Sequence, residues 1–423
     1  MPLHRTLLGA GLCLAFALPA SGATERNCEF TDAERKTTER AEAAVQAALP
    51  ELLRRHGVPG ASVALIADGH PRWTAGYGWA VPEKRIPFSP DTMFQVGSMT
   101  LPITAWALLH LVERGQIKLD APVSQYLKGR DLPESPFDVA AVTPARVLSH
   151  TAGLSIPRYE GFGPKQTLQT LNQSLRGALD AGDVPVAIVA PPGAGFAFSA
   201  GGYALAELMV RQTANEQFSK LANRQILRRL DMFRSSLPDR PDPSPPLAVT
   251  YDDAGNPAPA RSFSALGAAG LQTTVADYAR FVAAMLPGPC GEAMGRGAVG
   301  PGLVQLSREP QPNSDNDLLF AGSRYGLGVA LRALPDSGNT LVYHPGDNPP
   351  NWRGLFAAVP ERQSGIVVLT SAAGGEALRL ELLCTWIEAL GETPPAECPA
   401  VGPAQQPESE PSPERADMAQ EAD

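Results

Sequence analysis

The order of the predicted elements along the chain constrains its fold more than any other feature. Hydrophobic periodicity predicts helices at residues 37–56, 102–115, 201–215, 275–286 and 377–390, and strands at residues 60–68, 71–81, 325–334, 352–360 and 364–372. Strands therefore occupy both ends of the chain, and helices fill its middle. This order predicts one antiparallel sheet, built from the N- and C-terminal thirds and covered by helices, with a mostly helical lobe inserted between them.

The bulk composition fits such a domain. The chain has 423 residues, of which 43% are hydrophobic and 19% charged, so it has enough apolar material for a folded core and is predicted to be soluble and globular. The formal net charge is −9, and no cluster of lysine or arginine interrupts the folded part. Nucleic acid is therefore not expected as a partner. Residues 237–260 are too rich in proline for regular structure and are predicted to form a long surface loop.

Both ends of the chain are predicted to lie outside the domain of residues 24–398. Residues 1–23 begin with His4 and Arg5, continue with an apolar run that is short for a bilayer, and close on Ser21 and Ala23 with the spacing of a signal-peptidase site. We expect a cleaved export signal and no membrane span in the mature chain, with an uncleaved anchor as the alternative. Residues 399–423 are rich in proline and acidic residues and are predicted to be a disordered tail.

The cysteines agree with an exported protein. Removal of the signal leaves four of the five, Cys28, Cys290, Cys384 and Cys398. An even set in an oxidising compartment predicts at least one disulfide, although three pairings are open and buried free thiols are the alternative. The cysteines are scattered, with no CxxC and no histidine nearby, which argues against zinc; no metal or other cofactor is expected.

Eight stretches of the sequence occur in the order found in one protein family. They are GVPGASVALIADG, DTMFQVGS, ERGQIKLDAPVSQYL, VLSHTAGL, PPGAGFAFSAGGYAL, LGAAGLQTTVADYARF, YGLGVAL and YHPGDNPPNWRGLFAAVPERQSGIVVLTS. Through them, residues 37–391 resemble the serine β-lactamase-related proteins, in the class C branch that includes D-alanyl-D-alanine carboxypeptidases, D-aminopeptidases and esterases. The resemblance implies a β-lactamase/transpeptidase-like α/β (α+β) fold, an antiparallel sheet flanked by helices with an inserted helical lobe. It also implies a periplasmic or secreted protein of a bacterial envelope.

The family's site has three motifs: S-x-x-K on a helix, Tyr-x-Asn from the lobe, and Lys-Thr-Gly or His-x-Gly on a strand. The lysine and tyrosine share the proton of the serine hydroxyl, which makes it a nucleophile, and backbone N–H groups receive the charge on the attacked carbonyl. The first motif in this chain lies in VGSMTLPITAW, so Ser98 falls on the nucleophile and Leu101 on the lysine.

The second and third motifs are altered as well. The second reads Phe198-Ser199-Ala200 instead of Tyr-x-Asn, and the third reads His344-Pro345-Gly346, which keeps a histidine but loses the central hydroxyl. The N–H that would complete the oxyanion hole belongs to Asp347, whose carboxylate would disfavour an oxyanion unless it points away. Arg353, a little further on, is predicted to line the cleft, with an ordinary strand-surface role as the alternative.

All three changes replace a polar group with hydrocarbon. The ammonium, the phenol and the amide of the family motifs give way to Leu101, Phe198 and Ala200. The site therefore resembles apolar packing, and the acid-base help lost with these groups is typically worth about 10²- to 10⁴-fold in rate. The sequence predicts an inactive serine hydrolase homologue that acts as a binding or scaffold protein for a small-molecule or peptidoglycan-derived ligand; it identifies no protein partner.

Two alternatives concern single residues of the site. A residual serine hydrolase, acting as an esterase, a D-amino-acid peptidase or a β-lactamase-like enzyme, would use Ser98 with His344 as its base. Ser98 would otherwise serve as a helix N-cap that is retained for its hydrogen bond to the backbone. His150, in VLSHTAGL, is expected to be structural.

Overall fold

The computed structural model describes residues 32–240 and 247–399. The predicted export signal and residues 400–423 of the predicted tail lie outside these ranges. The main element is an eight-stranded antiparallel sheet in the order β3-β2-β1-β12-β11-β10-β9-β8. Its strands are β1 (Gly60–Ala67), β2 (His70–Val81), β3 (Ile86–Pro87), β8 (Arg324–Tyr325), β9 (Ala330–Ala333), β10 (Thr340–Asn348), β11 (Trp352–Val359) and β12 (Ser364–Thr370).

The two ends of the chain meet in the middle of this sheet. β1 pairs with β12 in a continuous register from Ala61 opposite Thr370 to Ala67 opposite Ser364. The first strands and the last strands therefore form one sheet, as the order of elements in the sequence predicts. The fold class expected from the sequence, an antiparallel sheet with flanking helices and an inserted lobe, is confirmed.

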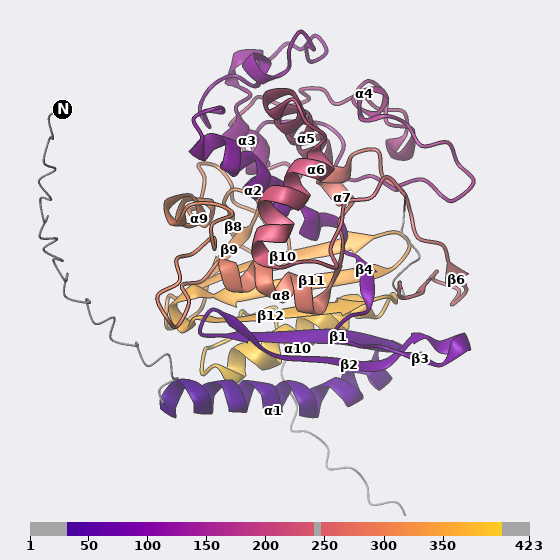
Figure 1. The fold of residues 1–423 in the computed structure, drawn as a ribbon, viewed down its shortest axis with the longest axis vertical. Helices are drawn as coiled ribbons and strands as arrows, with labels where there is room; N and C mark the ends of the chain where they lie inside the picture. Colours follow the sequence, from indigo (N-terminus) through magenta and orange to yellow (C-terminus); the bar gives the residue numbers. More distant parts are fainter. Residues whose placement is uncertain (1–31, 241–246, 400–423) are drawn as a thin grey trace, which may run out of the picture.

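Helices cover both faces of the sheet (Figure 1). α1 (Asp32–Arg55) and α10 (Gly375–Ala389) pack together on one face, and α8 (Val275–Ala284) packs on β1, β2 and β12 from the other. Alternate residues of β1 serve the two layers: Val63 and Leu65 belong to the core beneath α1 and α10, and Ile66 belongs to the core on the lobe side. Because both faces are buried, the central strands are apolar throughout rather than alternating.

The inserted lobe is helical and is drawn above the sheet in Figure 1. α2 contacts α5 and α7, and α5 also contacts α3 and α6. Polar bonds tie these helices together, because the Thr104 hydroxyl donates to the Gly267 carbonyl and the Gly267 N–H donates to the Glu207 carboxylate. The helices are α2 (Thr100–Glu113), α3 (Pro144–Leu148), α4 (Leu171–Ser174), α5 (Ala200–Ala214), α6 (Phe218–Ala222), α7 (Leu266–Ala269) and α9 (Pro301–Ser307).

The structure corrects two expectations for single segments. Residues 325–334, predicted as one strand, form two, because the chain turns between β8 and β9 at Gly328, whose φ of +94° favours glycine. Residues 237–260, predicted as loop, contain the short pair β5 (Thr250–Tyr251) and β6 (Pro257–Ala258), although residues 241–246 are outside the described ranges. A further short pair, β4 (Met93–Gln95) and β7 (Gln272–Thr274), leads into the first motif.

A disulfide joins Cys384 of α10 to Cys398. Cys290 is disulfide-bonded as well, whereas Cys28 lies outside the described residues. The prediction of at least one disulfide is therefore confirmed. Among residues 32–240 and 247–399, no helix has the length and apolar character needed to cross a membrane.

Candidate functional site

Ser98 lies in a tight turn between β4 and α2. The 3₁₀ turn Gly97–Met99 leads directly into α2, and Gly97 has a φ of +51°. The turn is held from behind, because the Tyr278 hydroxyl donates to the Met99 carbonyl at 2.8 Å and the Leu271 N–H donates to the Thr100 hydroxyl at 3.2 Å. The position of Ser98 is thus fixed by residues of the lobe and of α8.

The Ser98 side chain is partly exposed, and its hydroxyl has no hydrogen-bond partner among the described residues. Within the described part of the chain, its hydroxyl makes no hydrogen bond to a side chain or to the backbone. The N-cap of α2 is Met99, and no side chain caps that helix. The interpretation of Ser98 as an N-cap is therefore wrong, because the 3₁₀ turn puts the serine one residue before the cap position.

The three altered positions are apolar in space as well as in sequence. Leu101 is fully buried in α2, and Ala200 is 5% exposed at the start of α5. Both belong to the hydrophobic core of the lobe, and the partly buried Phe198 packs against that core. Packing of this kind stabilises the fold by about 1.5 to 3 kcal/mol for each large side chain that is buried.

The second motif is held by a serine and a histidine. The Ser199 hydroxyl accepts the Gly202 N–H at 2.9 Å, which caps α5, and donates to the Ser155 carbonyl at 2.6 Å. Nδ1 of His150 accepts the Ser199 N–H at 3.0 Å, and its ring stacks on Phe198 with centroids 4.2 Å apart. Burial, followed by the nearby His344 imidazole, lowers the pKa of His150 well below its usual value. His150 therefore positions the motif as a neutral side chain.

His344 of β10 is fully buried, and both of its ring nitrogens are engaged. Nδ1 donates to the Pro345 carbonyl at 2.5 Å, and Nε2 accepts from the Tyr325 hydroxyl at 2.7 Å. Burial lowers the pKa of His344 to about 4, so the ring is neutral at neutral pH. The ring centroid lies 6.3 Å from that of Phe198, so the structure brings the second and third motifs together. No hydrogen bond joins the described side chains of His344 and Ser98.

Strand β10 lies directly against the turn that carries Ser98. A Cβ atom at Gly346 would approach the Val96 carbonyl oxygen to 2.1 Å, and one at Gly354 would approach the Met99 sulfur to 2.6 Å. Gly346 and Gly354 are paired across β10 and β11. Because neither has a side chain, the turn that carries Ser98 packs directly on the backbone of these two strands. The close approach of strand and serine depends on these two glycines.

The Asp347 carboxylate is held in an ion pair. The two oxygens of Asp347 accept from the two terminal nitrogens of Arg379 at 2.6 and 3.2 Å, and Arg379 of α10 is 3% exposed. Arg379 also donates to the carbonyls of Gly346 and Gly354. Arg353 lies 3.7 Å from the same carboxylate and donates to Asn351, so it takes part in this network.

Taken together, these contacts order the backbone around Ser98, whereas its hydroxyl has no hydrogen bond to an acidic or basic side chain among residues 32–240 and 247–399. The sequence did not predict the roles of Tyr325, Arg379 and Ser199. These residues bind His344, Asp347 and the first turn of α5, and so hold the backbone around the site. The stretch YGLGVAL marked the position of Tyr325, but no local pattern links Arg379 to Asp347, which lies 32 residues away. The described residues contain no group of three or more histidine, cysteine, aspartate or glutamate side chains that could hold a metal ion.

This fold and this arrangement of motifs define a serine β-lactamase-like protein. The profile described as Beta-lactamase matches residues 41–383, so the chain belongs to the beta-lactamase family. The structure is similar to the octameric penicillin-binding protein homologue from Pyrococcus abyssi, with a TM-score of 0.68, 23% identity and coverage of 85% of this chain and 79% of that one. It is also similar to SurE with D-Leu, with a TM-score of 0.65, 21% identity and coverage of 85% and 78%. At these identities the likeness concerns the fold.

Curated relatives match shorter segments. The mitochondrial serine beta-lactamase-like protein LACTB from Homo sapiens is 34% identical over 100 residues, which cover 23% of this chain and 18% of that protein. Esterase EstB from Burkholderia gladioli is 34% identical over 121 residues, which cover 29% of this chain and 31% of the esterase. The matches thus span less than a third of the length of either relative.

Proposed function

We propose that this protein is a catalytically silent member of the beta-lactamase family that works by binding a ligand or partner. The observation that carries the proposal is the isolation of the Ser98 hydroxyl, which has no hydrogen-bonded base within the described part of the chain. A serine hydroxyl needs such a neighbour to lose its proton during attack. Leucine, phenylalanine and alanine occupy the positions from which the family supplies the base and its supporting amide.

Covalent labelling tests this proposal directly. The full chain is incubated with benzylpenicillin and, separately, with a fluorophosphonate, and its intact mass is measured over several hours. We expect no adduct beyond the trace seen with Ser98→Ala and no hydrolysis of the benzylpenicillin, while a penicillin-binding protein with a long-lived acyl-enzyme, treated in parallel, is labelled completely. A stoichiometric adduct that disappears in Ser98→Ala would refute the proposal.

The proposal includes export to a bacterial envelope. Its support is the N-terminal sequence pattern and the Cys384–Cys398 disulfide, because such bonds persist mainly in oxidising compartments. Mass measurement of the mature protein, recovered from the periplasm and from the medium of an expressing bacterium, tests it. We expect the chain to begin after Ala23; full-length protein retained in the cytoplasm would contradict export.

A residual hydrolase is the second candidate, and the match to an esterase favours it. In this mechanism His344 would take the proton of Ser98, which requires its ring to leave Tyr325 or Pro345. Turnover of p-nitrophenyl acetate distinguishes the candidates. If His344→Ala and Ser98→Ala both abolish a turnover that the wild type sustains, the residual hydrolase replaces the silent protein as the conclusion.

A further inference from the structure

Phe233 is a large apolar side chain that the fold leaves in solvent. It is 59% exposed, although Met232 beside it is fully buried. The Met232 N–H donates to the Leu227 carbonyl at 2.9 Å. The Arg234 N–H donates to the Asp277 carboxylate at 2.8 Å. These bonds fix the backbone on both sides of Phe233, so its ring projects from an ordered part of the chain.

The helix that leads to Phe233 has a buried apolar side and an exposed basic side. It is continuous over residues 218–230, beginning as α6 in Figure 1 and ending in the 3₁₀ turn Arg228–Leu230. Its buried side chains are Phe218, Leu221, Ala222, Ile226, Leu227 and Leu230, and its exposed basic side chains are Lys220, Arg224, Arg228 and Arg229. Residues 216–234 include five basic and two acidic residues, in a chain whose formal net charge is −9. The helix therefore gathers positive charge that is dispersed in the sequence.

Three of these cations have no carboxylate partner among the described residues. Arg228 donates to a neutral oxygen at 3.4 Å, and its guanidinium lies 5.4 Å from the centroid of the Phe233 ring. Arg229 donates to two neutral oxygens, at 3.2 and 3.3 Å. Lys220 makes no ion pair with a described carboxylate. Their positive charges are thus uncompensated, and a cation–π contact holds one of them against the exposed ring.

The other two basic side chains of this surface have carboxylate partners. Arg224 lies 2.6 Å from Glu216, and Arg234 lies 3.2 Å from Asp91. Both pairs are open to solvent, where an ion pair contributes little and is screened by salt. These two arginines therefore add to the positive charge that the surface presents to a strongly anionic partner.

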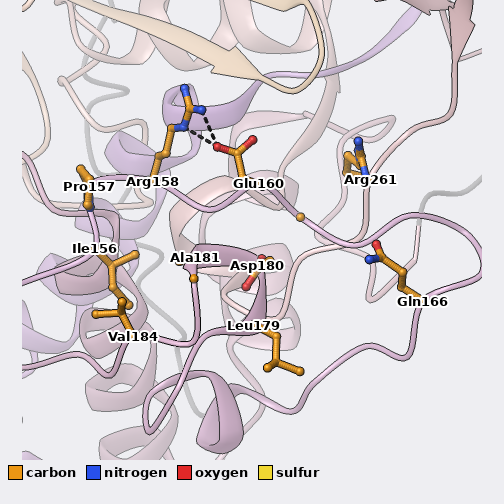
Figure 2. A pocket seen from close by; sticks show the side chains of 12 residues that line it. Ile156, Pro157, Arg158, Glu160, Gln166, Leu179, Asp180, Ala181, Val184 and Arg261 are labelled. Carbon is orange, nitrogen blue, oxygen red and sulfur yellow. Dashed lines mark hydrogen bonds and ion pairs between the residues drawn. The ribbon is translucent and has the colours of Figure 1, made fainter.

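A second exposed apolar side chain shows that exposure alone does not distinguish Phe233. Leu179 is 59% exposed as well. It lines a cavity of about 620 Å³ in the lobe, next to Asp180 and together with the Arg158–Glu160 ion pair, so its neighbours carry both signs of charge (Figure 2). Single exposed apolar side chains are ordinary on protein surfaces. The distinguishing feature of Phe233 is its place among arginines.

The surface offers no pocket to a protein partner at the start of its helix. A cavity of about 310 Å³ there is lined by Gln217, Phe218 and Ser219, but not by Phe233 or by any of the five cations. A protein partner would have to supply a pocket of its own for the protruding ring. A fluid bilayer accepts an aromatic ring at the level of its headgroups and needs no pocket. The geometry therefore favours an anionic lipid surface over an acidic protein.

From these contacts we propose that Phe233 and the helix of residues 218–230 dock the protein on an anionic lipid bilayer. The Phe233 ring enters the boundary between headgroups and acyl chains, and Lys220, Arg228 and Arg229 pair with lipid phosphates. Because the apolar side of the helix is buried in the lobe, the helix contributes charge and stays outside the acyl region. The inference goes beyond the proposed function and uses no residue of the Ser98 site.

Sedimentation with lipid vesicles tests the inference. The mature chain from Thr24 onward is used, because the apolar run in residues 1–23 would itself enter a bilayer. We expect binding to phosphatidylcholine vesicles that contain about 30% phosphatidylglycerol, at about 0.1 M NaCl, and at least tenfold weaker binding to pure phosphatidylcholine or at about 0.5 M NaCl. Absence of binding to the anionic vesicles would overturn the proposal.

Variants of the surface assign the contacts. Phe233→Ser should weaken binding to the anionic vesicles about fivefold, because the ring no longer enters the bilayer. The double variant Arg228→Gln, Arg229→Gln should weaken it about tenfold, because two charges at the membrane surface are lost. All three side chains are exposed, so both variants should keep the thermal unfolding midpoint of the wild type. Wild-type binding by either variant would refute the assignment.

The matched controls lie elsewhere in the lobe. Leu179→Ser removes an apolar side chain with the same exposed fraction as Phe233, and the double variant Lys165→Gln, Arg176→Gln removes two exposed cations. Both controls should bind the anionic vesicles within about twofold of the wild type. If they weaken binding as much as the surface variants do, the attraction belongs to the whole chain and the proposal fails.

A tryptophan at the tip of the surface reports insertion. In anionic vesicles with brominated acyl chains, Phe233→Trp should show an additional blue-shifted and quenched emission, measured against the wild type with its five native tryptophans. Vesicle binding without this quenching would show that the ring stays outside the bilayer, and would overturn the proposal. Binding to poly-L-glutamate but not to anionic vesicles, lost in Arg228→Gln, Arg229→Gln, would assign the surface to an acidic protein instead.

This proposal and that of a silent Ser98 site fail separately. Ser98→Ala should bind the anionic vesicles like the wild type, because Ser98 is not part of the surface. Acylation of Ser98 would therefore refute the silent site and leave the membrane surface standing, whereas absence of vesicle binding would do the reverse.

Discussion

Gly346 of β10 lies so close to Val96 that a Cβ atom there would approach the Val96 carbonyl oxygen to 2.1 Å. This contact locks the strand of the third motif to the turn that carries Ser98. The backbone thus holds Ser98 tightly, whereas the motif positions Leu101, Phe198 and Ala200 carry hydrocarbon side chains that belong to the lobe core or pack against it. The backbone arrangement and the side chains of the motifs can each be tested by mutation.

Restoring the three polar side chains should restore acylation. In the variant Leu101→Lys, Phe198→Tyr, Ala200→Asn, we expect benzylpenicillin to form close to one adduct per molecule, because the lysine and tyrosine can again take the proton of Ser98. Intact mass measures the adduct, and the same triple variant with Ser98→Ala is the control. A folded triple variant that neither forms an adduct nor hydrolyses benzylpenicillin would show that the backbone frame has changed too.

Two serines at neighbouring motifs should differ in their effect on stability. Ser98→Ala removes a hydroxyl without a hydrogen-bond partner among the described residues, so the free energy of unfolding should change by less than about 0.5 kcal/mol. Ser199→Ala removes the cap of α5 and the bond to the Ser155 carbonyl, and should cost about 1 to 2 kcal/mol. Urea unfolding of the two variants measures the difference; equal losses would contradict the assigned contacts.

Glu207 should make the protein less stable as the pH rises. Burial raises the pKa of Glu207 to about 7, against a value near 4.5 in the unfolded chain, while the Gly267 N–H offsets part of the shift. The folded state therefore binds more protons between these values, so the stability present at pH 4.5 is progressively lost up to pH 7. At about 1.4 kcal/mol per pKa unit, the loss is on the order of 3 kcal/mol.

The variant Glu207→Gln isolates this effect, because its amide oxygen can still accept the Gly267 N–H. We expect thermal unfolding of Glu207→Gln to depend less on pH than that of the wild type, with the largest gain above pH 7. Glu134→Gln, at an exposed position of the same lobe, should follow the wild-type profile. If both variants follow that profile, Glu207 does not titrate as assigned.

Much of the frame could be predicted from the sequence, because it rests on local signals. The five predicted helices begin and end within five residues of α1, α2, α5, α8 and α10. Strand β10 was harder to predict from the sequence, because Pro345 and Gly346 are residues typical of turns. It tolerates Pro345 since pairing with β9 ends at Tyr343, which leaves one edge of the strand without a ladder to donate to.

The site was only partly predictable, for a physical reason. The register of the motifs predicts Ser98, Leu101, Phe198 and His344 as site positions, because each motif is a short run of neighbouring residues. The partners of these residues come from distant elements, as when Tyr325 reaches His344 across the sheet. Likewise, the absence of a partner for Asp180 follows from three-dimensional packing and leaves no trace in its neighbouring sequence.

The pair of Asp347 and Arg379 should matter for stability more than an exposed ion pair does. Asp347→Ala leaves the 3% exposed Arg379 guanidinium without its carboxylate, and the carbonyls of Gly346 and Gly354 are then its only partners among the residues that the structure describes. Because Asp347 itself is half-exposed, we expect a loss of about 1.5 to 3 kcal/mol rather than the larger cost of breaking a fully buried pair.

The matched control for this loss is Asp315→Ala, which breaks an exposed pair with Arg324 and should cost less than about 1 kcal/mol. Urea unfolding of both variants measures the contrast. The loss of unfolding free energy in Asp347→Ala should also persist at 0.5 M NaCl, because the Arg379 guanidinium is buried between the sheet and α10, where salt has little access to it. A cost for Asp347→Ala no larger than that for Asp315→Ala would mean that Arg379 does not depend on this carboxylate to hold β10 against the Ser98 turn.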